Sequence, residues 1–158
     1  MKFGSKELAL TAIFTAVYAV LVLALAGISF QLVQVRVADA LIPLSMVFGW
    51  PAVIGVTLGS VVANVASPMP SILADVTFGS LANLLAGVLA WKLGQYSREF
   101  LGCVVATAVI TFIVGTYLAV LTEMEMWIWW LGIGIGSVIS INVLGYFLVK
   151  ATKKLLAE

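Results

Sequence analysis

The sequence predicts an all-α membrane protein with six transmembrane helices. Hydrophobic residues make up 63% of the 158 residues, and charged residues make up 9%. An ordinary soluble domain is roughly 45–50% apolar and about 25% charged, so it could not bury this much apolar surface. One span takes about 20 apolar residues, which leaves room for five or six helices and little else. We therefore expect residues 1–158 to form a single transmembrane domain.

The first three helices follow from one long apolar run and one helix break. Leu8–Ile28 is longer than the roughly 7–15 residues of a signal-peptide core, which favours a retained helix over cleavage at Ala24-Leu25-Ala26. The polar segment Ser29–Asp39 follows. The next apolar stretch is interrupted by Gly49-Trp50-Pro51, and Pro is well suited to start a helix. This interruption predicts a short helix and then a longer one.

Turn residues and charges divide the rest of the chain. Ser67-Pro68-Met69-Pro70-Ser71 indicates a turn. The charged stretches 92–99 and 123–125 indicate two further loops. The expected helices cover residues 7–28, 38–49, 51–66, 72–92, 100–122 and 126–149.

The distribution of basic residues predicts the topology. Cytoplasmic loops of membrane proteins carry an excess of Lys and Arg. Six spans place both termini and the 92–99 loop on one side, which we assign to the cytoplasm; five spans would separate Lys2 and Lys6 from the other basic residues. We expect a multi-pass protein of the plasma membrane with cytoplasmic termini. Seven of the eight basic residues then lie inside: Lys2, Lys6, Lys92, Arg98, Lys150, Lys153 and Lys154.

Missing residue types exclude several classes of function. The chain has no His, which removes Ser–His and Cys–His catalysis and nearly all zinc chemistry. The P-loop pattern G-x-x-x-x-G-K-[ST] is absent. A net charge of +1 without a basic patch indicates no nucleic-acid partner. We expect no catalytic residue and no metal site, and energy for any active transport would come from a gradient or another subunit.

Ionisable residues near or within the apolar segments are candidates for a binding site. Arg36 and Asp39 are three positions apart, so they could form a structural ion pair or one wall of a substrate site. Asp75 lies inside an expected helix, and burying a lone carboxylate there is costly. Gly79 and Asn83 follow it at spacings of four, with Phe78 alongside, on one helical face.

The preceding helix carries a second polar face, formed by Thr57, Ser60 and Asn64. The short turn between the two helices allows the two faces to meet. They could form hydrogen bonds between helices, which suffices to explain Thr57 and Ser60. Asp75 is better explained as a ligand-binding residue.

Pairs of small residues at four-residue spacing allow close helix contacts. Internal packing suffices to explain the glycine pairs Gly55/Gly59 and Gly132/Gly136. The pair Ala12/Ala16 could pack internally or dock another protein.

Several segments together resemble the QueT family. Gln34–Leu41 is similar to its signature Q-x-R-[IV]-[SA]-[ED]-A-L. Further similarities follow in order over Gly55 to Asn64, Ser67-Pro68, Asp75–Ala82 and Val143–Tyr146, so the resemblance covers nearly the whole chain.

This resemblance implies the substrate-binding S component of an energy-coupling-factor (ECF) transporter, a six-helix bundle. Such a subunit captures a vitamin-like molecule, here a 7-deazaguanine precursor of queuosine. It passes the molecule to a transmembrane coupling protein that two ATPase subunits drive, so ATP is hydrolysed by partners and this chain needs no cofactor. Ala12 and Ala16 match the A-x-x-x-A docking motif of these subunits. An S component for another vitamin, or a gradient-driven carrier or channel acting alone, are the alternatives.

A guanine-type edge has two N–H donors, and the two oxygens of one carboxylate can accept a hydrogen bond from each. The carbonyl oxygen on the same edge needs a hydrogen-bond donor. Asp75 or Asp39 could accept these N–H groups, and Phe78 and a Trp could stack on the ring faces. Our hypothesis is that Asp75 recognises the base and that Arg36–Asp39 shapes the outer mouth of the site. Relatives carry a Glu near the position of Ser137, and its absence here favours a neutral, cyano-substituted base. The predicted substrate-binding residues are Gln34, Arg36, Asp39, Asn64, Asp75, Phe78, Gly79 and Asn83.

Overall fold

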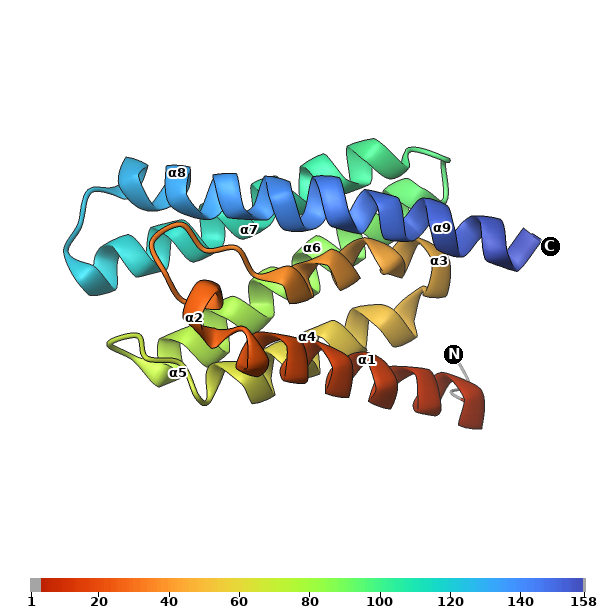
Figure 1. Cartoon of the computed structure of the whole chain (residues 1–158), viewed down its shortest axis with the longest axis horizontal. Helices are drawn as coiled ribbons and strands as arrows, with labels where there is room; N and C mark the ends of the chain where they lie inside the picture. Colours follow the sequence, from red (N-terminus) through yellow and green to blue (C-terminus); the bar gives the residue numbers. More distant parts are fainter. Residues whose placement is uncertain (1–3, 158) are drawn as a thin grey trace.

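A computed structural model describes residues 4–157, and every regular element in this range is helical, as predicted. Lys2, used above for the topology, lies outside the described residues. The helices form an elongated bundle (Figure 1). In chain order the elements are α1 Ser5–Ala24, α2 Ala26–Ser29, the 3-10 helix η1 Val37–Leu44, α3 Ser45–Phe48, α4 Trp50–Asn64, α5 Ile72–Ala74, the π-helical turn η2 Asp75–Gly79, α6 Ser80–Gly94, α7 Glu99–Thr122, α8 Met126–Ser137, the π-helical segment η3 Val138–Gly145 and α9 Tyr146–Ala157.

Four continuous helices in the described range are long and apolar enough to cross a membrane. Two further apolar helices, Val37–Phe48 and Trp50–Asn64, are shorter. The predicted all-helical membrane fold is therefore confirmed, whereas the predicted count of six spans is not. The four long helices are Ser5–Ala24, Ile72–Gly94, Glu99–Thr122 and Met126–Ala157.

The first short helix is mostly a 3-10 helix, formed by η1 and completed by the α-helical turn α3. A 3-10 helix rises about 2.0 Å per residue, so this segment extends roughly 22 Å, compared with roughly 18 Å for an α-helix of equal length. Gly49 ends the segment with a φ of 65°, a conformation that side chains disfavour. Pro51 then lies in the first turn of α4.

The last helix is longer than predicted. It reaches Ala157 instead of ending near residue 149, so the three C-terminal lysines belong to α9 and not to an irregular tail. Lys residues are good helix formers. In addition, Nζ of Lys153 forms an ion pair with Oε1 of Glu99 at 2.7 Å, which ties α9 to the start of α7. The start of α1 and the end of α9 lie at the same end of the bundle (Figure 1).

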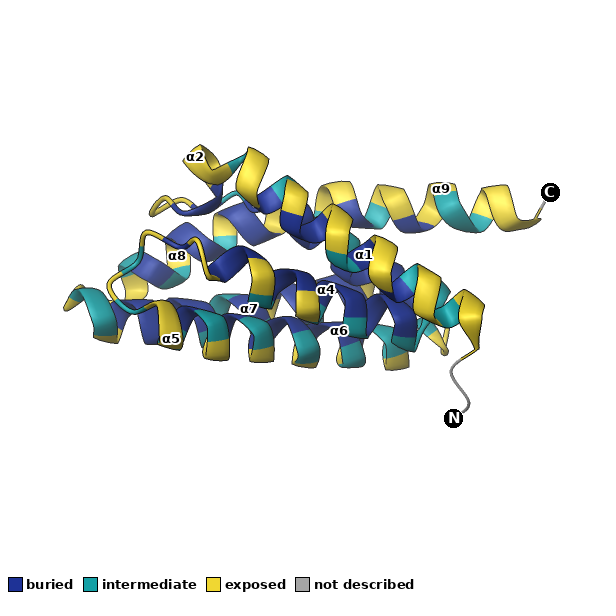
Figure 2. Cartoon of the chain, turned by 90° about the horizontal axis from the view of Figure 1, so that it is seen from below, coloured by how far each residue is buried: buried dark blue, intermediate teal, exposed yellow. Residues whose placement is uncertain are grey.

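Close contact between α1 and α4 depends on two glycines of α4. A Cβ atom added to Gly59 would lie 2.7 Å from Cβ of Tyr18 and 2.8 Å from the carbonyl oxygen of Thr15, and one added to Gly55 would collide with Phe14. Because these two glycines have no Cβ atom, the backbones of the two helices can pack directly against each other. Figure 2 shows the resulting pattern, with buried residues facing the bundle interior and exposed residues along the outer face of α1.

We expect Gly59→Ala to destabilise the protein by about 1–3 kcal/mol, the usual cost of overpacking a close contact. Tyr18 and Thr15 present atoms at or near the backbone, so α1 itself must move away. The measurement is thermal unfolding in detergent, followed by tryptophan fluorescence. Gly27→Ala is the control, because a Cβ there has no neighbour within 4 Å. Equal stability of the two variants would contradict this packing.

Candidate functional site

Three charged side chains are buried within the described part of the chain: Arg36, Asp39 and Asp75. Their exposed fractions are 5%, 4% and 1%. Arg36 immediately precedes η1, Asp39 lies in η1, and Asp75 begins the π-helical turn η2. Charge inside an apolar bundle is costly and usually marks a polar cavity or a functional site.

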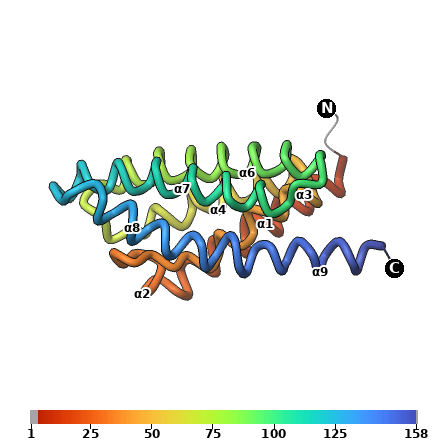
Figure 3. The backbone as a smooth tube through the Cα atoms, turned by 90° about the horizontal axis from the view of Figure 1, so that it is seen from above, coloured from red at the N-terminus to blue at the C-terminus, as the bar shows by residue number. Residues whose placement is uncertain are grey.

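The segment before η1 is held against α8 by the second glycine pair. A Cβ atom on Gly132 would overlap the carbonyl oxygen of Leu32, and one on Gly136 would overlap that of Gln34. These glycines thus accommodate a loop backbone, and not a neighbouring helix. Figure 3 shows this segment, in orange, running beside α8, in lighter blue. The contact fixes the backbone from which Gln34 and Arg36 enter the bundle.

Asp39 is hydrogen-bonded to a tyrosine and not paired with Arg36. The Tyr18 hydroxyl donates to Oδ1 of Asp39 at 2.5 Å, and Nδ2 of Asn83 donates to the Tyr18 oxygen at 2.8 Å. Arg36 makes no ion pair within 4 Å in the described chain, and its guanidinium lies 5.4 Å from the centre of the Phe30 ring. Of the two interpretations of Arg36 and Asp39, the direct ion pair is therefore not formed among the described residues. This network joins α1, η1 and α6.

Asp75 has an equivalent arrangement with α7. The Tyr117 hydroxyl donates to Oδ1 of Asp75. Nδ2 of Asn64 donates to the backbone carbonyl of Asp75 at 2.9 Å and lies 3.4 Å from Oγ of Ser60. Gly79 leaves room for the Asn64 amide, since a Cβ there would lie 2.5 Å from Nδ2. π-helical turns such as η2 are frequent at functional sites.

Arg36 lies near both networks without hydrogen-bonding to either among the described residues. Its guanidinium lies close enough to interact electrostatically with the two carboxyl groups of Asp39 and Asp75 and with the hydroxyls of Tyr18 and Tyr117. Segments far apart in the sequence thus contribute to one buried polar cluster. We define this cluster by the following residues, and include the buried Gln34 because it lies two positions before Arg36: Tyr18, Arg36, Asp39, Asn64, Asp75, Asn83 and Tyr117.

Four buried atoms of the cluster have no hydrogen-bond partner among the described residues. They are Oε1 of Gln34, Nε of Arg36, Oδ1 of Asn64 and Oδ2 of Asp75. Buried polar atoms in proteins are nearly always hydrogen-bonded, so such a group requires an explanation. Together they offer three acceptors and one charged donor. A ligand with several N–H groups and one acceptor would satisfy them.

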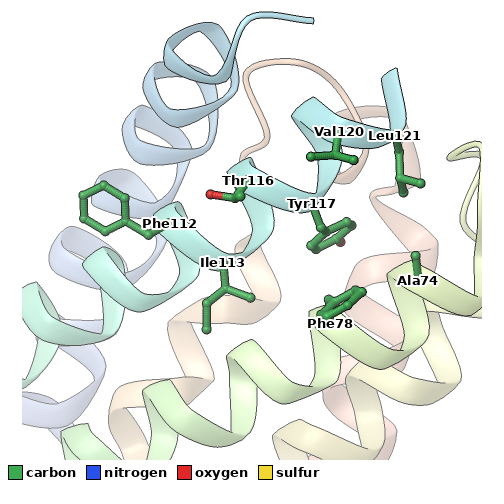
Figure 4. Close-up of a pocket in the computed structure, with 8 residues that line it drawn as sticks. All are labelled: Ala74, Phe78, Phe112, Ile113, Thr116, Tyr117, Val120 and Leu121. Carbon is green, nitrogen blue, oxygen red and sulfur yellow. The ribbon is translucent and has the colours of Figure 1, made fainter. Parts of the chain in front are cut away.

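An apolar groove of about 540 Å³ lies next to the cluster, between α5–η2 and α7. The rings of Phe78 and Tyr117 stack in it, with centroids 5.6 Å apart (Figure 4). Arg36, Asp39 and Asp75 do not line this groove. Tyr117 thus contributes its ring to the groove and its hydroxyl to the cluster. The groove is lined by Ala74, Phe78, Phe112, Ile113, Thr116, Tyr117, Val120 and Leu121.

Comparison with known families agrees with the sequence resemblance. The family model described as QueT transporter matches residues 8–154. The chain belongs to the QueT transporter family. Comparisons with curated proteins and with solved structures gave no match. Because QueT is a family of ECF-type S components, this chain is a membrane transport protein.

Most of the substrate-binding residues expected for this QueT protein lie in or beside the cluster. Gln34, Arg36, Asp39, Asn64 and Asn83 are buried. Asp75 is buried with them, and Gly79 supports the Asn64 amide. Phe78 is 44% exposed and faces the groove instead. Thr57, expected on the same face as Asn64, hydrogen-bonds to the Val53 carbonyl of its own helix.

Sequence reasoning did not identify the two tyrosines of this QueT site. Tyr18 and Tyr117 are 21 and 42 residues away from the aspartates that they contact. Each is a polar side chain inside a long apolar helix, which is the one signal that could have identified it.

Ala12 and Ala16 lie outside the buried cluster, on the exposed face of α1. Large apolar side chains surround them, with Ile13 58% exposed and Val20 62% exposed. Internal packing therefore does not explain this pair of small residues.

We expect Tyr18→Phe to lower the free energy of unfolding by about 1–3 kcal/mol, because a buried carboxylate and an amide each lose a partner while the ring is kept. Chemical or thermal unfolding of the purified QueT protein would measure this. Tyr96→Phe is the matched control, since Tyr96 is 75% exposed. If both variants unfold like the unaltered protein, the Tyr18 network does not contribute to stability.

Proposed function

We propose that this chain is the substrate-capture S component of an ATP-driven ECF-type uptake transporter and that its substrate is a 7-deazaguanine precursor of queuosine. The observation that carries the proposal is the buried cluster around Arg36, with four polar atoms that have no partner within the described chain. An apolar bundle needs no such group for its own stability. A bound polar molecule would explain it.

The donors and acceptors of the cluster suit a guanine-type edge. This edge presents two adjacent N–H donors and a neighbouring carbonyl oxygen. Tyr117 already occupies Oδ1 of Asp75, so Asp75 offers Oδ2 alone, and the second N–H would go to Asn64 or Gln34. Nε of Arg36 would donate to the carbonyl oxygen. In this arrangement two residues accept the two N–H groups, whereas the sequence suggested that both oxygens of one carboxylate would accept them.

Transport by such a subunit depends on partners. In this proposal the exposed alanines of α1 dock a transmembrane coupling protein, and ATPase subunits attached to that protein hydrolyse ATP. The exposed position of Ala12 and Ala16 supports this role. Both chain termini then face the cytoplasm; the start of α1 and the end of α9 lie at the same end of the bundle, which supports this orientation (Figure 1).

We expect Asp75→Asn to weaken binding of a 7-deazaguanine by at least about tenfold, because a charge-assisted hydrogen bond is lost. The binding assay is a titration of the purified protein, using quenching of its five tryptophans. Glu125→Gln, which neutralises an exposed carboxylate, should bind like the unaltered protein. Undiminished binding by Asp75→Asn would remove Asp75 from the site. Saturable binding of another vitamin instead would contradict the assignment of a 7-deazaguanine as the substrate.

Replacing both Ala12 and Ala16 with Leu should abolish uptake while the purified variant still binds its ligand. The larger side chains would block close approach of the coupling protein without entering the bundle. Uptake is measured in proteoliposomes that contain the complete transporter. Ala108→Leu, at an exposed alanine of α7, is the control. Loss of binding would indicate internal packing, and uptake by this chain without any ATPase would favour a gradient-driven carrier.

A further inference from the structure

A patch of positive charge lies at the end of the bundle where α9 terminates. Arg98 immediately precedes α7, and Lys150, Lys153 and Lys154 lie in α9. Glu99, the first residue of α7, pairs with Lys153 and is the one carboxylate among them. These five residues define the basic patch, and their four cations and one carboxylate give it a formal charge of +3. In Figure 3 the end of α9 projects beyond the other helices.

Two cations of the basic patch are exposed and form no ion pair with the described residues. They are Arg98 and Lys150. Lys150 lies close enough to Glu99 to interact with it electrostatically, and Arg98 is its neighbour in the sequence. The carboxylate of Glu99 already binds Nζ of Lys153 at 2.7 Å. The two exposed cations, from different helices, are therefore available to an anionic partner.

Aromatic rings adjoin these cations. Phe100 packs edge to face on Tyr146 of α9, with the ring centroids 5.7 Å apart. Nζ of Lys150 lies 5.5 Å from the centre of the same Tyr146 ring. Phe100 and the next residue of α9, Phe147, both expose most of their side chains. This combination of exposed rings and cations matches a molecule that has an anionic head and an apolar tail.

The basic patch lies at the depth where a bilayer changes from hydrocarbon to headgroups. Trp127, near the start of α8, is exposed, and tryptophan is enriched at membrane interfaces. A helix rises about 1.5 Å per residue, so the roughly 30 Å of a hydrocarbon core, measured from Trp127, ends near Phe147. The lysines of α9 follow in the next two turns. The rings then lie beside acyl chains and the cations beside headgroups.

We infer that the basic patch binds an anionic phospholipid, with its phosphate between Arg98 and Lys150 and its acyl chains against Phe100 and Phe147. A phospholipid carries both chemical groups at the right depth, whereas an acidic protein segment would leave the rings unused. The lipid would tie α9 to the start of α7, as the Lys153–Glu99 ion pair does. This inference requires only that the chain crosses a membrane, and it does not rest on the proposed function.

The experiment measures lipid binding to the purified, delipidated full-length protein by native mass spectrometry. The probes are phosphatidylglycerol and phosphatidylcholine with identical acyl chains. The unaltered protein should bind phosphatidylglycerol at least about tenfold more tightly, because each basic residue near a negative headgroup contributes roughly fivefold. The double variant Arg98→Gln/Lys150→Gln should bind the two lipids with similar affinity. Neither residue forms an ion pair in the described chain, so the Lys153–Glu99 contact is kept.

The double variant Lys6→Gln/Lys92→Gln is the matched control. It removes the same charge from the same end of the bundle, but Lys6 belongs to α1 and Lys92 to the last turn of α6. Figure 3 shows α6, in green, and α9, in dark blue, on opposite sides of the bundle. This variant should keep the preference for phosphatidylglycerol. Thermal unfolding gives a second measurement, since phosphatidylglycerol should stabilise the control variant and not Arg98→Gln/Lys150→Gln.

Competition with glycerol 3-phosphate separates a lipid from a free phosphate ester. This compound has the anionic group without acyl chains, so a large excess should not displace phosphatidylglycerol. Displacement would overturn the inference, because the rings would then contribute nothing. Equal binding of the two lipids by the unaltered protein would also overturn it and would leave an acidic protein segment as the partner. So would an equal loss of preference in both double variants, which would attribute the effect to overall charge.

Discussion

The burial of one guanidinium and two carboxylates in an apolar bundle is the constraint on which the rest of the structure depends. Each carboxyl group must recover in hydrogen bonds part of what it loses in solvation. Tyr18 brings α1 to Asp39, and Tyr117 brings α7 to Asp75. Asn83 of α6 completes the first of these contacts. Apolar contacts with lipid do not fix the position of one helix along another. The hydrogen bonds of the cluster therefore set the register of these helices.

Irregular backbone makes this arrangement possible. Non-helical chain at membrane depth is tolerated only where protein or a polar cavity surrounds it. The segment before η1 meets this condition because Gly132 and Gly136 let its carbonyl groups rest directly on α8. The π-helical turn η2 starts at Asp75, whose backbone carbonyl accepts a hydrogen bond from Asn64 outside its own helix. The segment before η1 and the turn η2 thus depart from regular α-helix where charged side chains are held.

Much of the fold follows from sequence, because apolar runs, Pro51 and the Pro-rich turn each act locally. The count of spans does not, because the apolar helices Val37–Phe48 and Trp50–Asn64 are shorter than the other four. Nothing in residues 37–44 indicates a 3-10 helix either. Local rules also failed for Arg36 and Asp39. An ion pair at this spacing requires α-helical geometry, but Arg36 lies in extended backbone before η1 (φ −89°, ψ 92°), which changes the direction of its side chain. The tyrosine partners depend on tertiary packing, which spacing cannot reveal.

In the proposed function, a site closed by its own side chains would be selective for a physical reason. Asp75 is 1% exposed and Arg36 is 5% exposed, so a ligand that reaches them must displace protein atoms. That cost is recovered only by a molecule whose donors and acceptors match those left without partners, because every mismatch leaves a polar group buried and unpaired. The apolar groove beside the cluster offers no comparable discrimination, since shape and apolar contact separate similar molecules only weakly. Tyr117 belongs to both the groove and the cluster. Its ring lines the weakly selective groove, and its hydroxyl hydrogen-bonds within the strongly selective cluster.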